Sequence, residues 1–220
     1  MKRSKKERFI IGIDEAGRGP LAGPVTVGAF GAYEKMGNWL LKNIFNNKLR
    51  DSKKLSSKKR EEIYKKLCML KNEGRIFFAV SHISNKIIDK KGISYATKLG
   101  IIGCLKKLEH ETATNKGAPC WLRKCGVIRL DGSLKAPEEY KNQKTIIKGD
   151  EKDVFIACAS IVAKVSRDRL MTRLGSTLPL YAFQIHKGYG TSLHRFILQK
   201  NGLSPLHRRS FCKNLTDFLK

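Results

Sequence analysis

An apolar run at residues 9–13 ends directly in two acidic residues, Asp14 and Glu15, and a segment rich in glycine and proline follows at 17–24. The run predicts a buried strand that stops at Asp14. Neighbouring side chains of a strand point to opposite faces of the sheet, so the two acids can share a site only if the backbone turns there. Residues 25–30 predict a second strand, which can pair antiparallel with the first.

The rest of the chain alternates between helix-like and strand-like patterns. Ile63, Leu67 and Leu70, for example, recur at the spacing of one helix face. Strands are predicted at 75–80, 127–131 and 146–147, and helices at 57–73, 94–111, 154–174 and 192–201. This order predicts an α/β fold around a mixed sheet. We expect a single domain over residues 1–220, with a helical C-terminal region from about residue 176.

Two more acids follow apolar segments. Asp131 ends the strand predicted at 127–131, and Asp150 comes just after the one at 146–147. Each has an ordinary alternative, because Asp-Gly is a common turn pair and Asp150 could lie at a helix N-terminus. Together with Asp14 they favour a common site, since strand ends line the ligand crevice of open α/β sheets.

Carboxylate oxygens without histidine or cysteine partners suit hard cations such as Mg²⁺ and Mn²⁺. Two such ions roughly 4 Å apart can hold a phosphodiester, activate water and stabilise the leaving oxygen. Without metal, four close carboxylates would repel one another, and some would take up protons. The four acids therefore predict a hydrolytic site that depends on divalent metal.

The charge of the chain is strongly positive, with 45 basic against 19 acidic residues and a net charge of +26. Such a surplus attracts polyanions, of which nucleic acid is the natural example. A general bias toward lysine is the alternative explanation, and composition alone would allow a non-catalytic nucleic-acid-binding protein. The acids argue against that protein class, because they would repel phosphate unless metal intervenes.

The cysteines and the N-terminus bear on the compartment. None of the six cysteines forms a C-x-x-C pair, which favours free thiols in a reducing cytosol. The apolar run at 9–13 is too short for a signal peptide, and no stretch is long enough to span a membrane. We expect a cytoplasmic monomer that does not bind membranes.

Seven segments, in order along nearly the whole chain, resemble the conserved blocks of the ribonuclease HII family. They are residues 12–24, 51–55, 130–132, 148–150, 157–168, 186–191 and 207–211. The resemblance implies the ribonuclease H fold, which is a mixed five-stranded sheet flanked by helices, with a helical C-terminal region. It also implies cleavage 5′ to ribonucleotides in duplex DNA, and of the RNA strand of RNA–DNA hybrids, leaving 3′-hydroxyl and 5′-phosphate ends.

The resemblance also implies roles for particular residues. The four acids Asp14, Glu15, Asp131 and Asp150 would be catalytic and hold two Mg²⁺ or Mn²⁺ ions. The backbone of Gly17, Arg18 and Gly19 would read the 2′-hydroxyl, Tyr189 would pack on the neighbouring sugar, and Lys53, Lys54, Ser160 and Lys164 would face phosphate. The alternatives for these last groups are a plain turn, a partly buried aromatic ring and solvated lysines.

Some positions depart from the family or have no evident role. Ala182 stands where relatives usually have glycine, and residues 34–47 look like an extra surface segment. Arg208 and Arg209 could be structural or face phosphate, and His194 has no evident partner. The nearest rival family, ribonuclease HIII, normally carries an additional N-terminal domain, whereas only eight residues precede the first predicted strand here.

Overall fold

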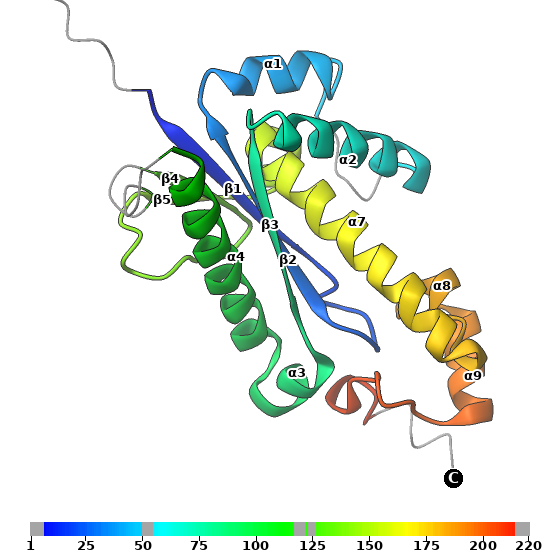
Figure 1. The fold of residues 1–220 in the computed structure, drawn as a ribbon. Coiled ribbons are helices and arrows are strands. Elements are labelled where there is room, and N and C mark those ends of the chain that lie inside the picture. The colour runs from blue at the N-terminus through cyan, green and yellow to red at the C-terminus, as the bar shows by residue number, and fades with distance from the viewer. Residues whose placement is uncertain (1–6, 50–54, 117–121, 123–125, 214–220) are drawn as a thin grey trace, which may run out of the picture.

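The computed structural model describes residues 7–49, 55–116, 122 and 126–213. Its centre is a five-stranded sheet of order β3-β2-β1-β4-β5 (Figure 1). The strands are β1 (Phe9–Ala16), β2 (Val25–Tyr33), β3 (Phe77–Ile83), β4 (Val127–Asp131) and β5 (Gln143–Ile146). β1 pairs antiparallel with β2 and parallel with β4, so the sheet is mixed, as predicted.

Several predicted strand boundaries are wrong. β2 extends to Tyr33 rather than residue 30, and β3 covers Phe77–Ile83 rather than 75–80. β1 continues two residues past Asp14, and the chain turns only at Gly17, which has the left-handed φ of 88°. The last strand covers 143–146 rather than 146–147. Three of its four residues are polar because it lies at the sheet edge, so an apolar pattern could not locate it, and Ile147 is exposed instead.

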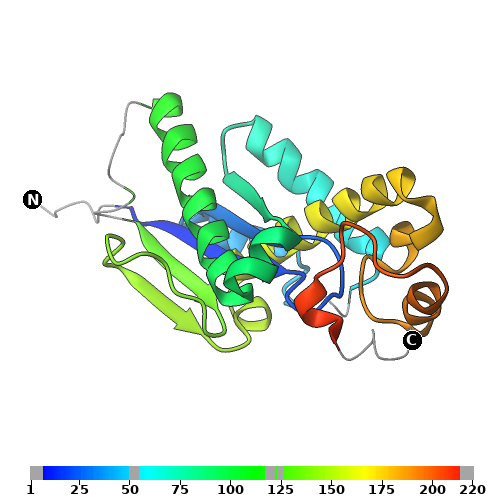
Figure 2. The same cartoon turned by 90° about the horizontal axis from the view of Figure 1, so that it is seen from below.

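The helices cover both faces of the sheet. They are α1 (Met36–Asn43), α2 (Ser57–Asn72), α3 (Asn85–Lys91), α4 (Ile93–Lys116), α6 (Gly149–Lys152), α7 (Val154–Thr177), α8 (Phe183–His186) and α9 (Ser192–Asn201), with short 3-10 turns η2 (Pro179–Tyr181) and η3 (Arg209–Phe211). α4 lies on one face, and α7 with α1 and α2 on the other (Figures 1 and 2). No helix in these described ranges is long and apolar enough to cross a membrane.

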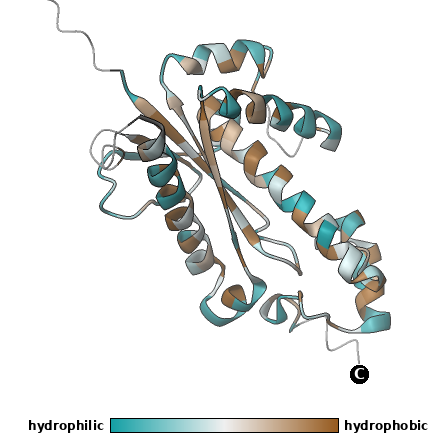
Figure 3. Ribbon diagram, viewed as in Figure 1, coloured by the Kyte–Doolittle hydropathy of each residue, from teal (hydrophilic) through white to brown (hydrophobic). Residues whose placement is uncertain are grey.

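Alternation along β1 divides the core in two. Ile10 packs in the cluster on the α7 face, whereas Ile11 and Ile13 pack with residues of α4. Figure 3 shows the apolar strands between these helices. Gly12 lets α7 lie very close to the sheet, because a Cβ there would come within 2.2 Å of the Phe155 backbone. The close approach brings α7 side chains to the end of β1.

The expectation that residues 34–47 form a surface segment is wrong for its apolar residues. Within it, Leu40, Ile44 and Phe45 are buried in the same core cluster as Ile10. These residues recur at i, i+4 and i+5, so the short helix and its C-terminal turn cover the sheet with one apolar face.

Candidate active site

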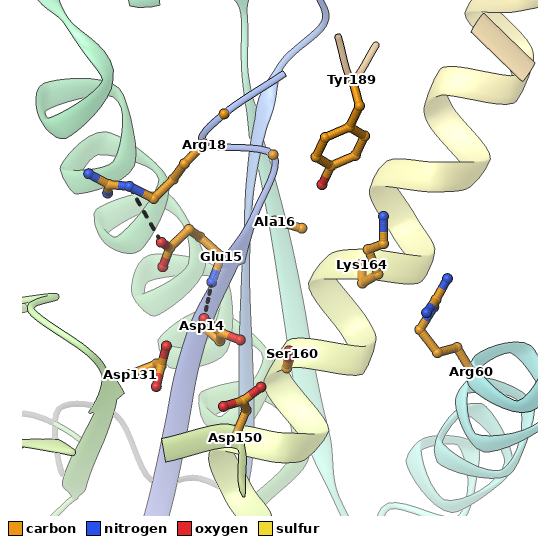
Figure 4. Close-up of a pocket in the computed structure, with 12 residues that line it drawn as sticks. Asp14, Glu15, Ala16, Arg18, Arg60, Asp131, Asp150, Ser160, Lys164 and Tyr189 are labelled. Carbon is orange, nitrogen blue, oxygen red and sulfur yellow. Dashed lines mark hydrogen bonds and ion pairs between the residues drawn. The ribbon is translucent and has the colours of Figure 1, made fainter. Parts of the chain in front are cut away.

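A cavity of about 460 Å³ opens where β1 and β4 end (Figure 4). Its lining consists of Asp14, Glu15, Ala16, Gly17, Arg18, Gly19, Arg60, Asp131, Asp150, Ser160, Lys164 and Tyr189. We call Asp14, Glu15, Asp131 and Asp150 the acid wall, and residues 17–19 with Tyr189 the loop wall. The cavity therefore brings together ten of the twelve residues singled out from the sequence. The other two, Lys53 and Lys54, lie outside the described residues.

Strand register accounts for two members of the acid wall. β1 and β4 run parallel with Ile13 opposite Leu130, so Asp14 and Asp131 follow at neighbouring positions. Ile13 and Leu130 both point into the α4-side core. Because side chains alternate along a strand, the next residue of each strand points to the α7 face.

Asp14 is buried, with 6% of its surface exposed. Burial raises the pKa of its carboxyl well above the ordinary value, and the negative charges of Glu15 and Asp131 raise it further. Hydrogen bonds from Ser160 and from the Glu15 backbone N–H (2.7 Å to Oδ1) act in the opposite direction on the pKa but are smaller than the burial effect. The ionised form of Asp14 is therefore less stable in the acid wall than it would be in water.

Glu15 points away from Asp14, toward Arg18, whose Nε lies 3.7 Å from Oε1 (Figure 4). The sequence predicted that the two acids could share a site only if the strand ended at Asp14. The strand continues to Ala16, and both acids nevertheless line one cavity. The cavity therefore reaches both faces of the sheet at the end of β1.

Asp150 is not at a strand end but in the first turn of the short helix α6, which is the alternative left open by the sequence. Lys148 adopts a left-handed conformation (φ 54°) just before this helix. The Gly149 backbone N–H then donates to Asp131 Oδ1 at 2.6 Å. This turn ties β4 to α6 and brings Asp150 to the same cavity as Asp131.

A nearby acid that sequence reasoning did not single out, Asp153, serves the fold. Its Oδ1 accepts from the backbone N–H groups of Phe155 and Ile156, which caps α7. Its Oδ2 lies 2.7 Å from Arg129 Nη1. Asp153 is not part of the cavity lining, so it offers a structural counterpart to Asp150 three residues earlier.

The side of the cavity opposite the acid wall is basic and aromatic. Lys164 of α7 lies 5.1 Å from the centre of the Tyr189 ring and forms a 3.0 Å ion pair with Asp168. Arg60 of α2, which the sequence reasoning missed, also lines the cavity and lies 3.8 Å from Asp168. The sequence pattern of α2 shows only that Arg60 lies away from the apolar stripe formed by Ile63, Leu67 and Leu70.

Two buried arginines lie behind the loop wall, and the sequence reasoning missed the first of them, Arg167. Arg167 is fully buried and donates to the carbonyl oxygens of Pro24 (3.0 Å), Ala22 (3.2 Å) and Lys187 (3.0 Å). Arg208 is also fully buried, and it is structural rather than phosphate-facing. The expectation that His194 lacks a partner is wrong, because its Nε2 lies 2.9 Å from His207 Nε2.

The donor set of the cavity fits a hard divalent cation, because its described lining offers carboxylate and hydroxyl oxygens and contains no histidine or cysteine. Over residues 7–49, 55–116, 122 and 126–213, no three His, Cys, Asp or Glu side chains lie close enough to hold a metal ion as they stand. Ion binding would therefore require the carboxylates to turn toward one another.

Two solved structures resemble the fold at low sequence identity. The fold matches a chain described as the PCNA:RNase HII complex from Archaeoglobus fulgidus with a TM-score of 0.64 and 24% identity, over 96% of this chain and 97% of that one. It matches Bst-RNase HIII in complex with Mn²⁺ with a TM-score of 0.70 and 18% identity, over 97% and 70%. The predicted ribonuclease H-like fold is confirmed.

Closer relatives come from sequence. The family model described as Ribonuclease HII matches residues 11–214. The ribonuclease HII of Caldicellulosiruptor bescii is 43% identical over 208 residues, which cover 94% of this chain and 88% of the relative. That of Prochlorococcus marinus subsp. pastoris is 41% identical over 205 residues, covering 93% and 88%. This chain therefore belongs to the ribonuclease HII family of hydrolytic endonucleases.

Proposed function

We propose that this chain hydrolyses the phosphodiester bond 5′ to ribonucleotides embedded in duplex DNA, and cuts the RNA strand of RNA–DNA hybrids. The observation that carries the proposal is that the acid wall and the loop wall face one cavity. Carboxylates alone would fit many metal-dependent hydrolases. Backbone groups and an aromatic ring opposite them add a means of selecting the sugar.

Asp14, Glu15, Asp131 and Asp150 would hold two Mg²⁺ or Mn²⁺ ions. When bound, such ions supply activation of water and stabilisation of the leaving oxygen. The raised pKa of Asp14 supports this role. Burial raises it most and the charges of Glu15 and Asp131 raise it further, and a cation bound among the carboxylates would offset both costs. The Mn²⁺ in the related fold of Bst-RNase HIII is consistent with this class of ion.

The loop wall would recognise the ribonucleotide. The 2′-hydroxyl is the group that distinguishes RNA from DNA, and it can both donate and accept a hydrogen bond. Backbone groups of Gly17, Arg18 and Gly19 line the cavity and would read it. Tyr189 is 38% exposed, which leaves ring surface available to pack on the adjoining sugar.

Phosphate would be held by basic groups around the same cavity. Ser160 and Lys164 would contact it from α7, with Arg60 joining them from α2. Lys53 and Lys54 would contribute from their own segment. The net charge of +26 supports docking of a duplex, and binding would weaken with rising salt as condensed counterions are released.

The reaction adds water across one P–O bond. A bond forms between the water oxygen and phosphorus, and the bond to the 3′-oxygen of the preceding nucleotide breaks. That oxygen takes up a proton, which gives a 3′-hydroxyl end, and the ribonucleotide keeps a 5′-phosphate.

Two duplexes that differ in a single 2′-hydroxyl test the proposal, each incubated with Mg²⁺, with Mn²⁺ or with EDTA. We expect one cut, 5′ to the ribonucleotide, with either metal and none with EDTA or with the all-DNA duplex. Equal cleavage of both duplexes, or cleavage that survives EDTA, would contradict the proposal. Poor cleavage of the single ribonucleotide beside efficient cleavage of a hybrid would instead indicate the specificity of ribonuclease HIII.

A further inference from the structure

Arg208 binds the backbone of the glycine-containing loop from behind. Its Nη2 donates to the Gly17 carbonyl at 2.7 Å, its Nη1 to the Arg18 carbonyl at 2.8 Å and its Nε to the Gly23 carbonyl at 2.9 Å. The side chain is fully buried. Burial, reinforced by the charge of Arg167, lowers its pKa to about 9, so it remains charged at neutral pH.

These contacts set the direction of the loop's N–H groups. In a planar trans peptide, the carbonyl and the N–H of the next residue point in opposite directions. Turning the Gly17 and Arg18 carbonyls toward Arg208 therefore turns the N–H groups of Arg18 and Gly19 away from it. Both residues line the cavity, where a 2′-hydroxyl would need a donor.

His207, the residue before Arg208, is connected through His194 to Tyr189, which is the other part of the loop wall. The Ser204 backbone N–H donates to His207 Nδ1 at 2.8 Å, so in the neutral ring the proton sits on Nε2. That N–H faces His194 Nε2 at 2.9 Å, which must then accept. His194 consequently carries its proton on Nδ1 and donates to the Tyr189 carbonyl at 2.9 Å.

A parallel contact holds the turn before Tyr189. The Gly188 backbone N–H donates to His186 Nδ1 at 3.1 Å, so His186 carries its proton on Nε2 and donates to the Tyr181 carbonyl at 2.7 Å. The His186 and His194 rings stack with their centres 4.0 Å apart. The backbone thus determines the tautomer of each of these three histidines.

Building on the proposed function, we propose that Arg208 and His207 are positioning residues which fix, from one short segment, the placement of the Gly17–Gly19 backbone relative to Tyr189. Arg208 acts directly on the loop, and His207 acts through His194. The segment is itself anchored, since the Arg208 backbone N–H donates to the Leu21 carbonyl at 2.7 Å. The preference for a ribonucleotide beside deoxynucleotides depends on this placement.

The first test compares neighbouring arginines. The dissociation constant is measured for the duplex with one ribonucleotide and for its all-DNA match, in the wild type and in Arg208→Lys, Arg208→Gln and Arg209→Gln. Lysine keeps the charge but loses the planar fork. In both Arg208 variants the preference for the ribonucleotide-containing duplex should fall about tenfold, which corresponds to the loss of roughly one hydrogen bond. The affinity for the all-DNA duplex should be unchanged. The exposed Arg209, whose substitution removes the same charge, should leave the preference intact.

The second test reads the histidines by ¹⁵N NMR and does not depend on activity. We expect His194 to be protonated on Nδ1, and His186 and His207 on Nε2. His207→Gln, which can still donate to His194, should keep the His194 tautomer and the ribonucleotide preference. His207→Leu, which cannot donate, should lose both.

The outcomes separate the two proposals. A wild type that cuts both duplexes equally well would overturn the proposed function. A wild type that cuts selectively but binds both duplexes equally well would overturn the positioning proposal alone. A wild type with the preference, combined with Arg208 variants that keep it in full, would overturn the positioning role of Arg208. A His194 ring protonated on Nε2, or a His207→Leu variant with unchanged preference, would overturn the role of His207.

Discussion

The acid wall and the loop wall enclose the same cavity but are stabilised in different ways. In the acid wall, burial and neighbouring carboxylates raise the pKa of Asp14, so the ionised form is held there at a cost. In the loop wall, the buried guanidinium of Arg208 and the ring of His194 each meet backbone groups at hydrogen-bonding distance. A bound cation would offset the cost of charge in the acid wall, whereas the loop wall is organised before any ligand arrives.

The largest expected effect follows from neutralising the acid wall. Asp14→Asn should lower cleavage by more than about 100-fold, because even an outer-shell partner of a metal ligand is worth about 10–100-fold. The same change removes a buried negative charge, so without divalent ions the variant should melt at a higher temperature than the wild type. Cleavage rates and thermal unfolding in EDTA check both expectations.

Asp153→Asn is the matched control. Asparagine caps a helix about as well as aspartate, so this variant should lose some stability with its Arg129 ion pair and keep most of its activity. If Asp14→Asn cut normally, or melted lower than the wild type in EDTA, the contrast between the walls would fail.

A second, intermediate effect concerns pH and the loop wall. Burial lowers the pKa of His194 and of His207 from 6.5 to about 4. Each ring therefore binds fewer protons in the folded chain than in the unfolded chain. The unfolding free energy should fall as the pH drops from 6.5 toward 4, by up to roughly 1.4 kcal/mol per pH unit for each histidine. Urea unfolding across this range measures the slope.

The His207→Leu variant should show a shallower slope over the same pH range, because it has one buried imidazole fewer to protonate. An identical slope in the variant would mean that other groups cause the acid sensitivity, and the loop wall would not be the part of the cavity that fails in acid.

The smallest effect expected is at Ala182, a non-glycine residue in the left-handed conformation (φ 49°, ψ 35°) just before α8. Ala182→Gly should stabilise the chain by about 0.5–1 kcal/mol, because the relief of backbone strain exceeds the added flexibility of the unfolded state. Thermal melting measures it. The same replacement at Ala113, inside α4, should instead destabilise by about 1 kcal/mol, and a gain at both positions would contradict the strain argument.

Local patterns were sufficient for the centre of the sheet. A strand that is buried on both faces reads as a continuous apolar run, which located β1. β4 alternates between buried and half-buried residues, and Val127, Ile128 and Leu130 were enough to locate it. The edge strand β5 carries Lys144 and Thr145, and its position depends on pairing with β4 rather than on its own composition. The sequence therefore predicted the strand before Asp150 too late, and it offered the helix that carries Asp150 only as an alternative.

The loop wall's supports could not be predicted in this way. Arginine and histidine are mostly exposed or half-buried in proteins, so a sequence gives no reason to bury Arg208. Its partners Gly17 and Arg18 lie some 190 positions earlier in the chain. Only the folded backbone brings such distant groups together, and the chemical roles of the cavity residues stay predictions.

The central position of β1 in the sheet affects how often its backbone can open to solvent. The strand is hydrogen-bonded to a neighbour along each edge and covered by helices on each face. Its amides can exchange with solvent only when the whole sheet comes apart, whereas surface turns can open by themselves. The backbone of Asp14 consequently keeps its position for as long as the sheet stays intact.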